Sequence, residues 1–191
     1  MRRLEGQAII SCVWTWLCRE TQQGAFIRKT RFMANDPTPR LRRVSNKDLE
    51  ARTRLVYGVL KEYKLEPDPG ATDADLKDIE RSYFARGGTF FVLTDQDGSI
   101  VGAYGLYPLE NQTCELRKMY LHKSHRGKGL GKFLLDSALV EASRLGFGTV
   151  TLETASVLKE AIALYERYGF VEYEPDHLSI RCDHAYFLQL R

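Results

Sequence analysis

The sequence lacks the signatures of several common protein classes, beginning with those built on cysteine. It has four cysteines, Cys12, Cys18, Cys114 and Cys182, with no CxxC pair and no Cys/His cluster spaced like a metal site. We therefore expect reduced thiols, as in a cytosol, and no bound metal. Cys114 lies in an expected strand without an evident histidine partner, which favours core packing over a nucleophilic role.

Long apolar runs are also missing. The ten-residue run AIISCVWTWL at 8–17 is too short to span a bilayer. Two arginines precede it as in a signal peptide, but no small-x-small cleavage pattern follows and charged residues come soon after. We expect a cytoplasmic protein that does not bind membranes. Residues 1–38 are expected to be an N-terminal extension, with Met33 placed where a shorter relative would begin, and residues 39–191 the catalytic domain.

A strong excess of one charge is the third absence. The 28 Lys and Arg residues are scattered among 25 Asp and Glu residues, giving a formal net charge of +3. This balance is too mild to favour a nucleic-acid partner. The 191 residues, 43% of them hydrophobic, are enough to bury one sizeable core. We therefore expect a single globular domain with an appendage.

What is present centres on residues 114–146, where a strand-like run is followed by a glycine-rich turn and then by a helical pattern. Three glycines stand at alternate positions: Gly127, Gly129 and Gly131. Three basic residues share the stretch: Arg126, Lys128 and Lys132. Glycines permit positive φ and close approach of a ligand, and the following helix begins with free N–H groups. The pattern predicts a binding site for a di- or triphosphate.

Two other known phosphate-binding motifs fit this glycine-rich turn less well. A Walker loop needs Ser or Thr after its Gly-Lys pair, but Phe133 follows Lys132 here. A dinucleotide fingerprint needs GxGxxG, and G-K-G-L-G lacks the glycine at the required third position. A nucleotide hydrolase is a further alternative, but the sequence offers no evident ligands for its Mg²⁺.

The string R-G-K-G-L-G instead fits Arg/Gln-x-x-Gly-x-Gly/Ala, and there the sequence resembles the GNAT superfamily of acyl-CoA-dependent N-acetyltransferases. The run ELRKMYLHKSHRGKGLGKFLL is similar to that family's central strand, loop and helix. The run LETASVLKEAIALYERYGF is similar to its next strand and helix. Together they cover roughly residues 87–175. The resemblance implies acetyl-CoA as co-substrate, no metal, and direct transfer of an acetyl group to a primary amine in a ternary complex.

Periodicity places the elements around these motifs. Helical spacing predicts helices at 48–63, 73–85, 129–146 and 159–168. Alternation and turn signals predict strands near 41–44, within 89–109 as a hairpin turning at Asp95–Gly98, and at 114–121, 149–153, 171–174 and 182–190. We expect an α/β fold with a GNAT-type mixed, mostly antiparallel sheet of about six or seven strands flanked by about four helices.

Strict alternation divides the strand 114–121 into two sides. One side would carry Glu115, Arg117, Met119 and Leu121. The other would carry Cys114, Leu116, Lys118 and Tyr120. Each side mixes polar with apolar residues, as expected of a strand that lines a site, although a solvated edge strand would have the same pattern.

The resemblance assigns the cofactor contacts. Main-chain groups of Met119, Tyr120 and Leu121 are expected to pair with the pantetheine arm as an added strand would. The pyrophosphate is expected on the loop and helix start formed by Arg126, Gly127, Lys128, Gly129, Leu130, Gly131 and Lys132. Many members carry an Asn where this chain has Leu158, so one polar contact to the cofactor arm is expected to be missing.

The resemblance also assigns the chemistry. Tyr165, in LYERYGF, occupies the position of the family's general acid, and a phenol pKa of about 10 is near that of a thiol. Packing against Leu164 and Tyr168 is the structural alternative. Glu115 is the best-placed carboxylate for general base, with Glu153 behind it. Glu115 could equally be an ordinary ion-pair partner of Arg117, with water removing the proton.

The sequence does not identify the acceptor amine. A small-molecule amine and a protein amino group are both compatible, and by resemblance the loop Glu66–Ala71 is expected to form a lip of the acceptor pocket. Pairing into a homodimer through terminal strands is a further expectation. The alternative function is a non-catalytic acyl-CoA-binding sensor or interaction module, which an intact loop and Tyr165 argue against.

Overall fold

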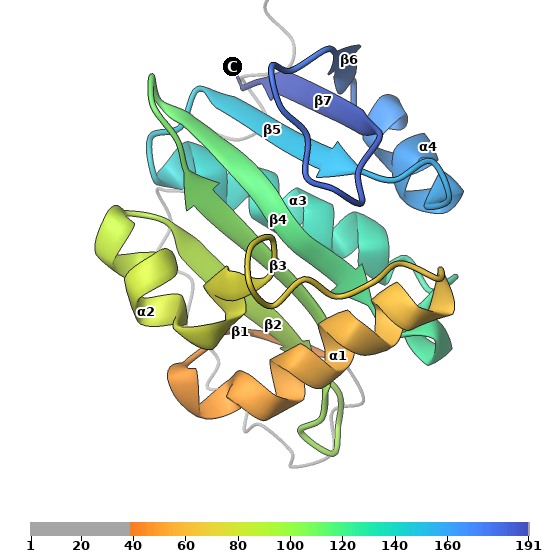
Figure 1. Cartoon of the computed structure of the whole chain (residues 1–191). Helices are drawn as coiled ribbons and strands as arrows, with labels where there is room; N and C mark the ends of the chain where they lie inside the picture. The colour runs from red at the N-terminus through yellow and green to blue at the C-terminus, as the bar shows by residue number, and fades with distance from the viewer. Residues whose placement is uncertain (1–38, 191) are drawn as a thin grey trace, which may run out of the picture. The chain divides into compact units, whose positions relative to one another are not determined.

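The computed structural model describes residues 39–190, which form one seven-stranded mixed sheet with helices on both faces (Figure 1). The strand order is β1-β2-β3-β4-β5-β7-β6. All neighbouring strands are antiparallel except β4 and β5, which are parallel and joined through α3. The predicted fold class is confirmed. The predicted extension and its apolar run at 8–17 lie outside the described residues.

The elements follow the predicted order. The strands are β1 Arg40–Arg43, β2 Thr89–Thr94, β3 Ile100–Pro108, β4 Thr113–Leu121, β5 Thr149–Thr154, β6 Val171–Tyr173 and β7 His184–Gln189. The α-helices are α1 Leu49–Glu62, α2 Ile79–Ser82, α3 Leu130–Arg144 and α4 Lys159–Arg167. Single 3-10 turns occur at Asn46–Asp48, Ala74–Lys77, Phe84–Arg86 and Lys123–His125.

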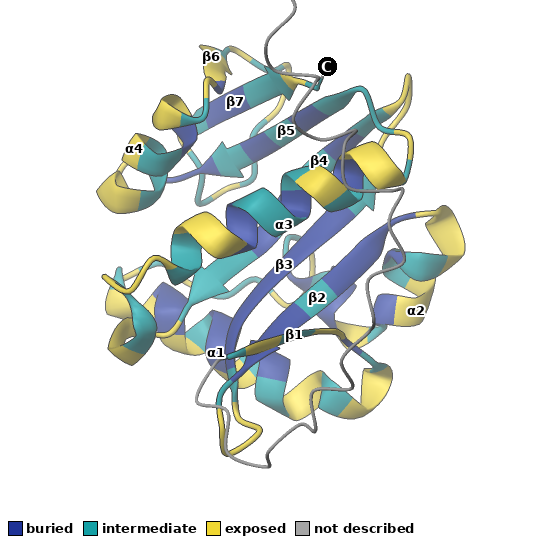
Figure 2. Cartoon of the chain, turned by 180° about the vertical axis from the view of Figure 1, so that it is seen from behind, coloured by how far each residue is buried: buried dark blue, intermediate teal, exposed yellow. Residues whose placement is uncertain are grey.

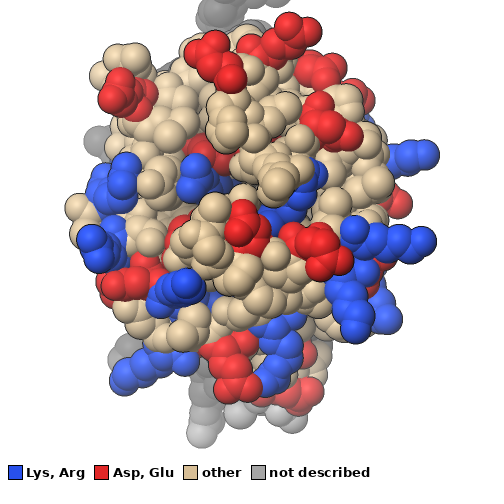
Figure 3. Space-filling model, viewed as in Figure 1, with Lys and Arg blue, Asp and Glu red and all other residues tan. Residues whose placement is uncertain are grey.

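The sheet separates two apolar cores, and its central strands are buried on both sides (Figure 2). On the α3/α4 face the core is formed mainly by Leu116, Leu134, Leu135, Ala138, Val150, Leu152 and Phe170. On the α1/α2 face it is formed mainly by Val56, Val59, Leu60, Leu76, Ile79, Tyr83, Phe90 and Val92. Seen from the α1/α2 side, acidic and basic side chains are interspersed over the surface, in keeping with the small net charge (Figure 3).

The predicted helix at 73–85 is wrong. The segment forms three short turns because Asp78 adopts an extended conformation, with φ −143° and ψ 92°. The Asp78 side chain accepts a hydrogen bond from the Arg81 N–H and starts α2 anew, as an N-cap residue does. Earlier in the segment, Asp73 and Asp75 are buried and engaged with other parts of the chain. The segment therefore follows its polar contacts rather than the helical spacing of its apolar residues.

The predicted sides of β4 are also wrong beyond Arg117, because a bulge interrupts the strand. The register with β3 shifts between Ala103 and Gly105, and Lys118 lies at φ 55°. Arg117 and Lys118 consequently both face α1 and α2, where Lys118 Nζ donates to the Thr72 carbonyl at 2.7 Å. Met119 and Leu121 pack on the α3/α4 core instead. The bulge thus places two consecutive cations on one face.

Candidate active site

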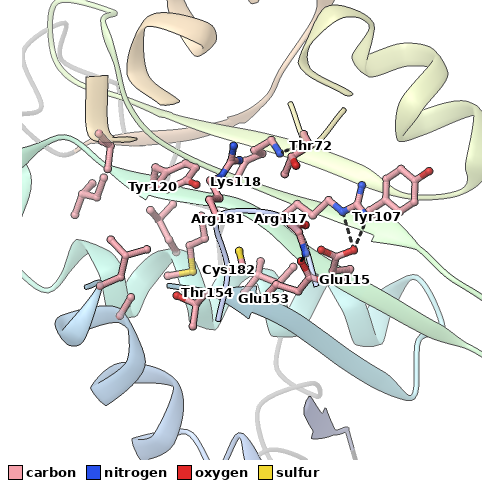
Figure 4. A pocket seen from close by; sticks show the side chains of 18 of the residues that line it. Thr72, Tyr107, Glu115, Arg117, Lys118, Tyr120, Glu153, Thr154, Arg181 and Cys182 are labelled. Carbon is pink, nitrogen blue, oxygen red and sulfur yellow. Dashed lines mark hydrogen bonds and ion pairs between the residues drawn. The ribbon is translucent and has the colours of Figure 1, made fainter. Parts of the chain in front are cut away.

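A cleft of about 1550 Å³ crosses the sheet where β4 and β5 diverge. Its glycine-loop end is lined by Tyr120, Leu121, Arg126, Gly127, Gly129, Gly131, Lys132, Leu158, Ala161, Leu164 and Tyr165. Its charged end is lined by Asp75, Lys77, Arg81, Tyr107, Glu115, Arg117, Lys118, Glu153, Leu178, Ile180, Arg181 and Cys182. The Asp68 and Ala71 side of the predicted lip also lines the cleft. The charged end collects residues from five separate stretches of the chain, several of which are labelled in Figure 4.

The glycine loop exposes the start of α3 to the cleft. Gly127 and Gly129 have φ values of 72° and 78°, and Gly129 is the N-cap residue of α3. The first bond of the helix runs from the Phe133 N–H to the Gly129 carbonyl at 3.0 Å. The amides of the first turn, including that of Gly131, consequently have no intrahelical acceptor. These N–H groups and the positive end of the helix dipole can hold an anion.

The predicted basic side chains of this loop are largely used within the protein. Arg126 Nε donates to the Leu121 carbonyl at 2.9 Å, and its Nη2 lies 2.7 Å from Glu62 Oε2 as an ion pair that lacks hydrogen-bond geometry. Lys128 donates to the Ser124 carbonyl, and Lys132 to Asp136 at 2.8 Å. The backbone amides are therefore the main free donors of the loop.

Two predicted cofactor residues have side chains outside the large cleft. Lys128 and Leu130 line a smaller hollow together with Pro39, the turn 95–97 and His125. Their backbone N–H groups still belong to the loop and the first turn of α3. That Lys128 and Leu130 bind the cofactor stays a prediction, and it concerns only their main-chain N–H groups.

The divergence of β4 and β5 leaves one edge of β4 open. The two strands pair only from Thr113 with Thr149 to Glu115 with Thr151. Beyond this point the main chain of residues 116–121 is paired on its β3 side alone. An extended ligand can add to this edge as a strand would. The Leu121 carbonyl is already used by Arg126, so Met119 and Tyr120 offer the freer main-chain groups.

Tyr165 of α4 contacts β4 across the cleft. The residue is only 6% exposed, its ring packs against Phe170, and its hydroxyl contacts Met119 Sδ at 3.9 Å. Burial, with a smaller contribution from Tyr120, raises the pKa of Tyr165 well above its ordinary value. The phenol stays protonated at neutral pH and can donate its proton. The two interpretations of Tyr165, core packing and proton donation, are therefore compatible, because its ring is packed and the residue also lines the cleft.

The two candidate carboxylates at the charged end differ in their partners (Figure 4). Arg117 donates to Glu115 Oε2, by Nε at 2.7 Å and also by Nη2, and its guanidinium lies 3.9 Å from the centre of the Tyr107 ring. Glu153 Oε2 accepts from the Ser179 N–H at 3.0 Å, and within residues 39–190 no basic side chain pairs with it. Glu115 is thus neutralised by a neighbour, whereas Glu153 is not.

Sequence reasoning missed a buried ion network that joins the walls of the charged end. Arg181 binds Asp73 with two hydrogen bonds, at 2.8 and 2.6 Å, and Asp73 is 1% exposed. Lys118 Nζ lies 3.1 Å from Asp73 Oδ1. It also lies 3.4 Å from Asp75 Oδ1, near enough for an ion pair but not placed for a hydrogen bond. No spacing rule links residues 73, 118 and 181, since tertiary folding alone brings them together.

Other candidate groups give no second site. Burial raises the pKa of the Cys114 thiol to about 12, so Cys114 is core packing as expected. Among residues 39–190 no group of three or more His, Cys, Asp or Glu side chains is arranged to hold a metal. The helices in that range are too short or too polar to cross a membrane.

Comparison with known proteins matches these features. The family model described as the acetyltransferase (GNAT) family matches residues 55–170, which include the glycine loop, the open edge of β4 and Tyr165. The chain belongs to the GNAT family of acetyltransferases. An uncharacterized N-acetyltransferase of Escherichia coli K12, YjgM, is 41% identical over 138 residues, covering 70% of this chain and 82% of that protein. Human N-acetyltransferase 8 is 30% identical over half of this chain and 44% of its own length.

Solved GNAT structures share the fold. An acetyltransferase of the GNAT family from Staphylococcus aureus Mu50 superposes with a TM-score of 0.75 at 24% identity, covering 81% of this chain and all of that one. YncA of Salmonella typhimurium, solved with acetyl-CoA, has a TM-score of 0.63 at 22% identity and covers 81% of this chain and 95% of its own. Leu158, where the resemblance to the family led us to expect a missing polar contact, lines the cleft as the N-cap residue of α4 and makes no side-chain cap.

Proposed function

We propose that the chain is an N-acetyltransferase that moves the acetyl group of acetyl-CoA to a primary amine by direct transfer in a ternary complex. One observation carries the proposal. A glycine loop with free helix amides, an open strand edge and a buried phenol all line the same cleft. Relatives named N-acetyltransferases and a neighbour solved with acetyl-CoA support the same reaction.

The cofactor fits the cleft from the loop inward. Its diphosphate would accept hydrogen bonds from the amides that follow Gly129 at the start of α3. Its pantetheine arm would pair with the open edge of β4 at Met119 and Tyr120. The thioester would then lie next to Tyr165, whose hydroxyl is in contact with Met119. The charged end is left for the acceptor amine.

The reaction needs three proton transfers beside one bond exchange. The acceptor ammonium loses a proton, and its nitrogen then attacks the thioester carbonyl carbon. A C–N bond forms while the C–S bond breaks, and the departing thiolate takes the phenolic proton of Tyr165. The second proton that the nitrogen loses as the amide forms then returns the phenolate to the phenol, directly or through water. Glu115 and Glu153, which face the cleft from β4 and β5, are the candidates to accept the ammonium proton, directly or through water.

The test of this proposal is Tyr165→Phe beside Tyr168→Phe. Tyr168 lies one turn along, at the end of α4, and its hydroxyl bonds Asp136 away from the cleft-lining set. We expect thiol release from acetyl-CoA, measured over a panel of amines, to fall about 100-fold for Tyr165→Phe and to stay unchanged for Tyr168→Phe. Affinity for acetyl-CoA, measured by calorimetry, should stay within about twofold in both.

The outcomes separate enzyme from sensor. Binding of acetyl-CoA without turnover on any amine would support a non-catalytic acyl-CoA sensor instead. Glu115→Gln and Glu153→Gln, assayed over the same pH range, identify the base, because only loss of the base removes the acidic limb of the pH profile of kcat.

A further inference from the structure

We propose that the acceptor is a free α-amino acid, bound by its carboxylate at Arg117 and by its ammonium group at Glu153. This inference rests on the proposed acetyl transfer and names the substrate class of the same site. It is based on the side chains at the charged end whose charge or N–H groups are not matched by another residue of the protein.

Most charges at this end are matched within the protein. Asp73 is shared by Arg181 and Lys118, and Asp75 accepts from Tyr83 and faces Lys118. Of the two carboxylates that face the cleft from β4 and β5, Glu115 is paired with Arg117, whereas the one described partner of Glu153 is a neutral N–H group. A half-buried carboxylate without a cation favours a cationic ligand over a neutral one. The ammonium group of an acceptor amine supplies that charge.

One guanidinium is only partly used. Nε and Nη2 of Arg117 both donate to a single oxygen of Glu115, and in the described part of the chain Nη1 has no hydrogen-bond partner. The guanidinium carbon lies over the Tyr107 ring, 3.9 Å from its centre, and this contact together with the two bonds to Glu115 restrains the group. A restrained guanidinium with a free N–H edge suits a carboxylate. Two exposed cations at the rim, Lys77 and Arg81, add positive potential there.

The two anchors lie on strands that border the same cleft. Arg117 on β4 and Glu153 on β5 each lie two positions beyond Glu115 and Thr151, the last pair of the two strands, and both point away from the α3/α4 core (Figure 4). The opening between the diverging strands separates the guanidinium from the carboxylate, and one α-amino acid that makes a charge-assisted hydrogen bond of about 2.8 Å to each would bridge it. A simple amine would leave the Arg117 edge unmatched, and a protein N-terminus has an amide where the carboxylate would be.

The loop between β6 and β7 suggests what side chain the amino acid carries. It crosses in front of β5 and is held down by Arg181 (Figure 1). Leu178 and Ile180 line the cleft from this loop, and Ile180 is 90% exposed. An apolar side chain would cover part of that surface. Leucine is therefore a suitable probe.

The experiment compares three matched acceptors: leucine, leucinamide and 3-methylbutylamine. The last two lack the carboxylate but keep the amine and the apolar chain. We expect kcat/KM for leucine to exceed that for either by at least tenfold. In Arg117→Met the leucine-to-leucinamide ratio should fall to near one, whereas a purely structural role of Arg117 would lower both values and preserve the ratio. Arg54→Met, on an exposed arginine of α1, is the matched control and should keep the wild-type ratio.

A second readout keeps this inference separate from the proposed reaction. Calorimetry measures leucine and leucinamide binding to the protein saturated with CoA. If acetyl transfer occurs but the ratio in the wild-type protein is near one, the amino-acid inference is overturned and the transferase stands. If no amine is acetylated while leucine still binds at least tenfold tighter than leucinamide, the amino-acid site stands and the transferase fails. Equal or absent binding together with no turnover overturns both.

Discussion

The two ends of the cleft present different kinds of groups. The glycine-loop end presents main-chain groups, namely the first amides of α3 and the open edge of β4. The charged end presents side chains that come from the 68–82 segment, β3, β4, β5 and the loop before β7. Main-chain recognition comes from a continuous stretch of sequence, whereas side-chain recognition depends on packing between distant segments.

The difference predicts that one end tolerates sequence change better than the other. A backbone amide is present at almost any residue, so the glycine-loop end needs only the right turn and helix start. The charged end needs particular ionisable groups, and three of them, Asp73, Lys118 and Arg181, are paired with one another in a buried network. Loss of one charge there leaves another unmatched in a dry environment, which is costly. Cofactor binding and acceptor binding should therefore respond separately to substitution.

The largest expected effect is at the charged end. Asp73→Asn leaves Arg181 and Lys118 without their shared carboxylate, and we expect it to lower the free energy of unfolding by about 3 kcal/mol. Urea denaturation measures the loss, with Asp97→Asn in the exposed β2–β3 turn as control. Calorimetry on the folded variant should still detect acetyl-CoA binding, and a loss of cofactor affinity would contradict the separation of the two ends.

The same substitution has a predicted pH dependence. Burial opposes ionisation of Asp73, but the hydrogen bonds from Arg181, with the charge of Lys118, outweigh it and lower its pKa below the ordinary value. A lowered carboxyl pKa contributes stability that is fully present above the unfolded pKa of about 3.9 and is lost as pH falls through the folded pKa. The stability difference between wild type and Asp73→Asn should therefore shrink below about pH 4.

An intermediate effect is expected at the glycine-loop end. Gly129→Glu places a side chain at φ 78° and a negative charge where the diphosphate would bind, so affinity for acetyl-CoA should fall roughly 100-fold. Gly146→Glu is the matched control, because Gly146 has φ 85°, a Cβ there would also meet nothing within 4 Å, and it follows the opposite end of α3. Both variants should lose similar stability, and equal loss of affinity in both would refute the loop assignment.

The smallest expected effect is a gain. Leu158→Asn supplies an N-cap side chain for α4 and a polar group in the cleft, and we expect acetyl-CoA to bind about threefold to fivefold tighter. Leu158→Ala distinguishes a new polar contact from relief of crowding, since it should give no gain. An unchanged affinity in Leu158→Asn would mean that the missing contact is unimportant in this chain.

Much of the fold was predictable because its signals are local. Alternation marked the strands, Gly98 at φ 78° closes the predicted hairpin turn, and Gly146 ends α3 as expected. The predictions that were wrong fell where distant contacts override local pattern. The 73–85 segment forms short turns instead of one helix because its buried carboxylates bind other parts of the chain. In β4 the alternation of sides is interrupted at Lys118 by the bulge.

The sequence alone determined the family, the order of the strands and helices, and the glycine loop, because each depends on residues that are near one another in the chain. Tertiary structure decided which cations are free and which are already paired. It placed Arg181 on Asp73, 108 positions away, turned Lys118 toward the same carboxylate, and left Glu153 without a described cationic partner. Pairing of charges depends on distance in space and on burial, and neither can be obtained from spacing along the chain.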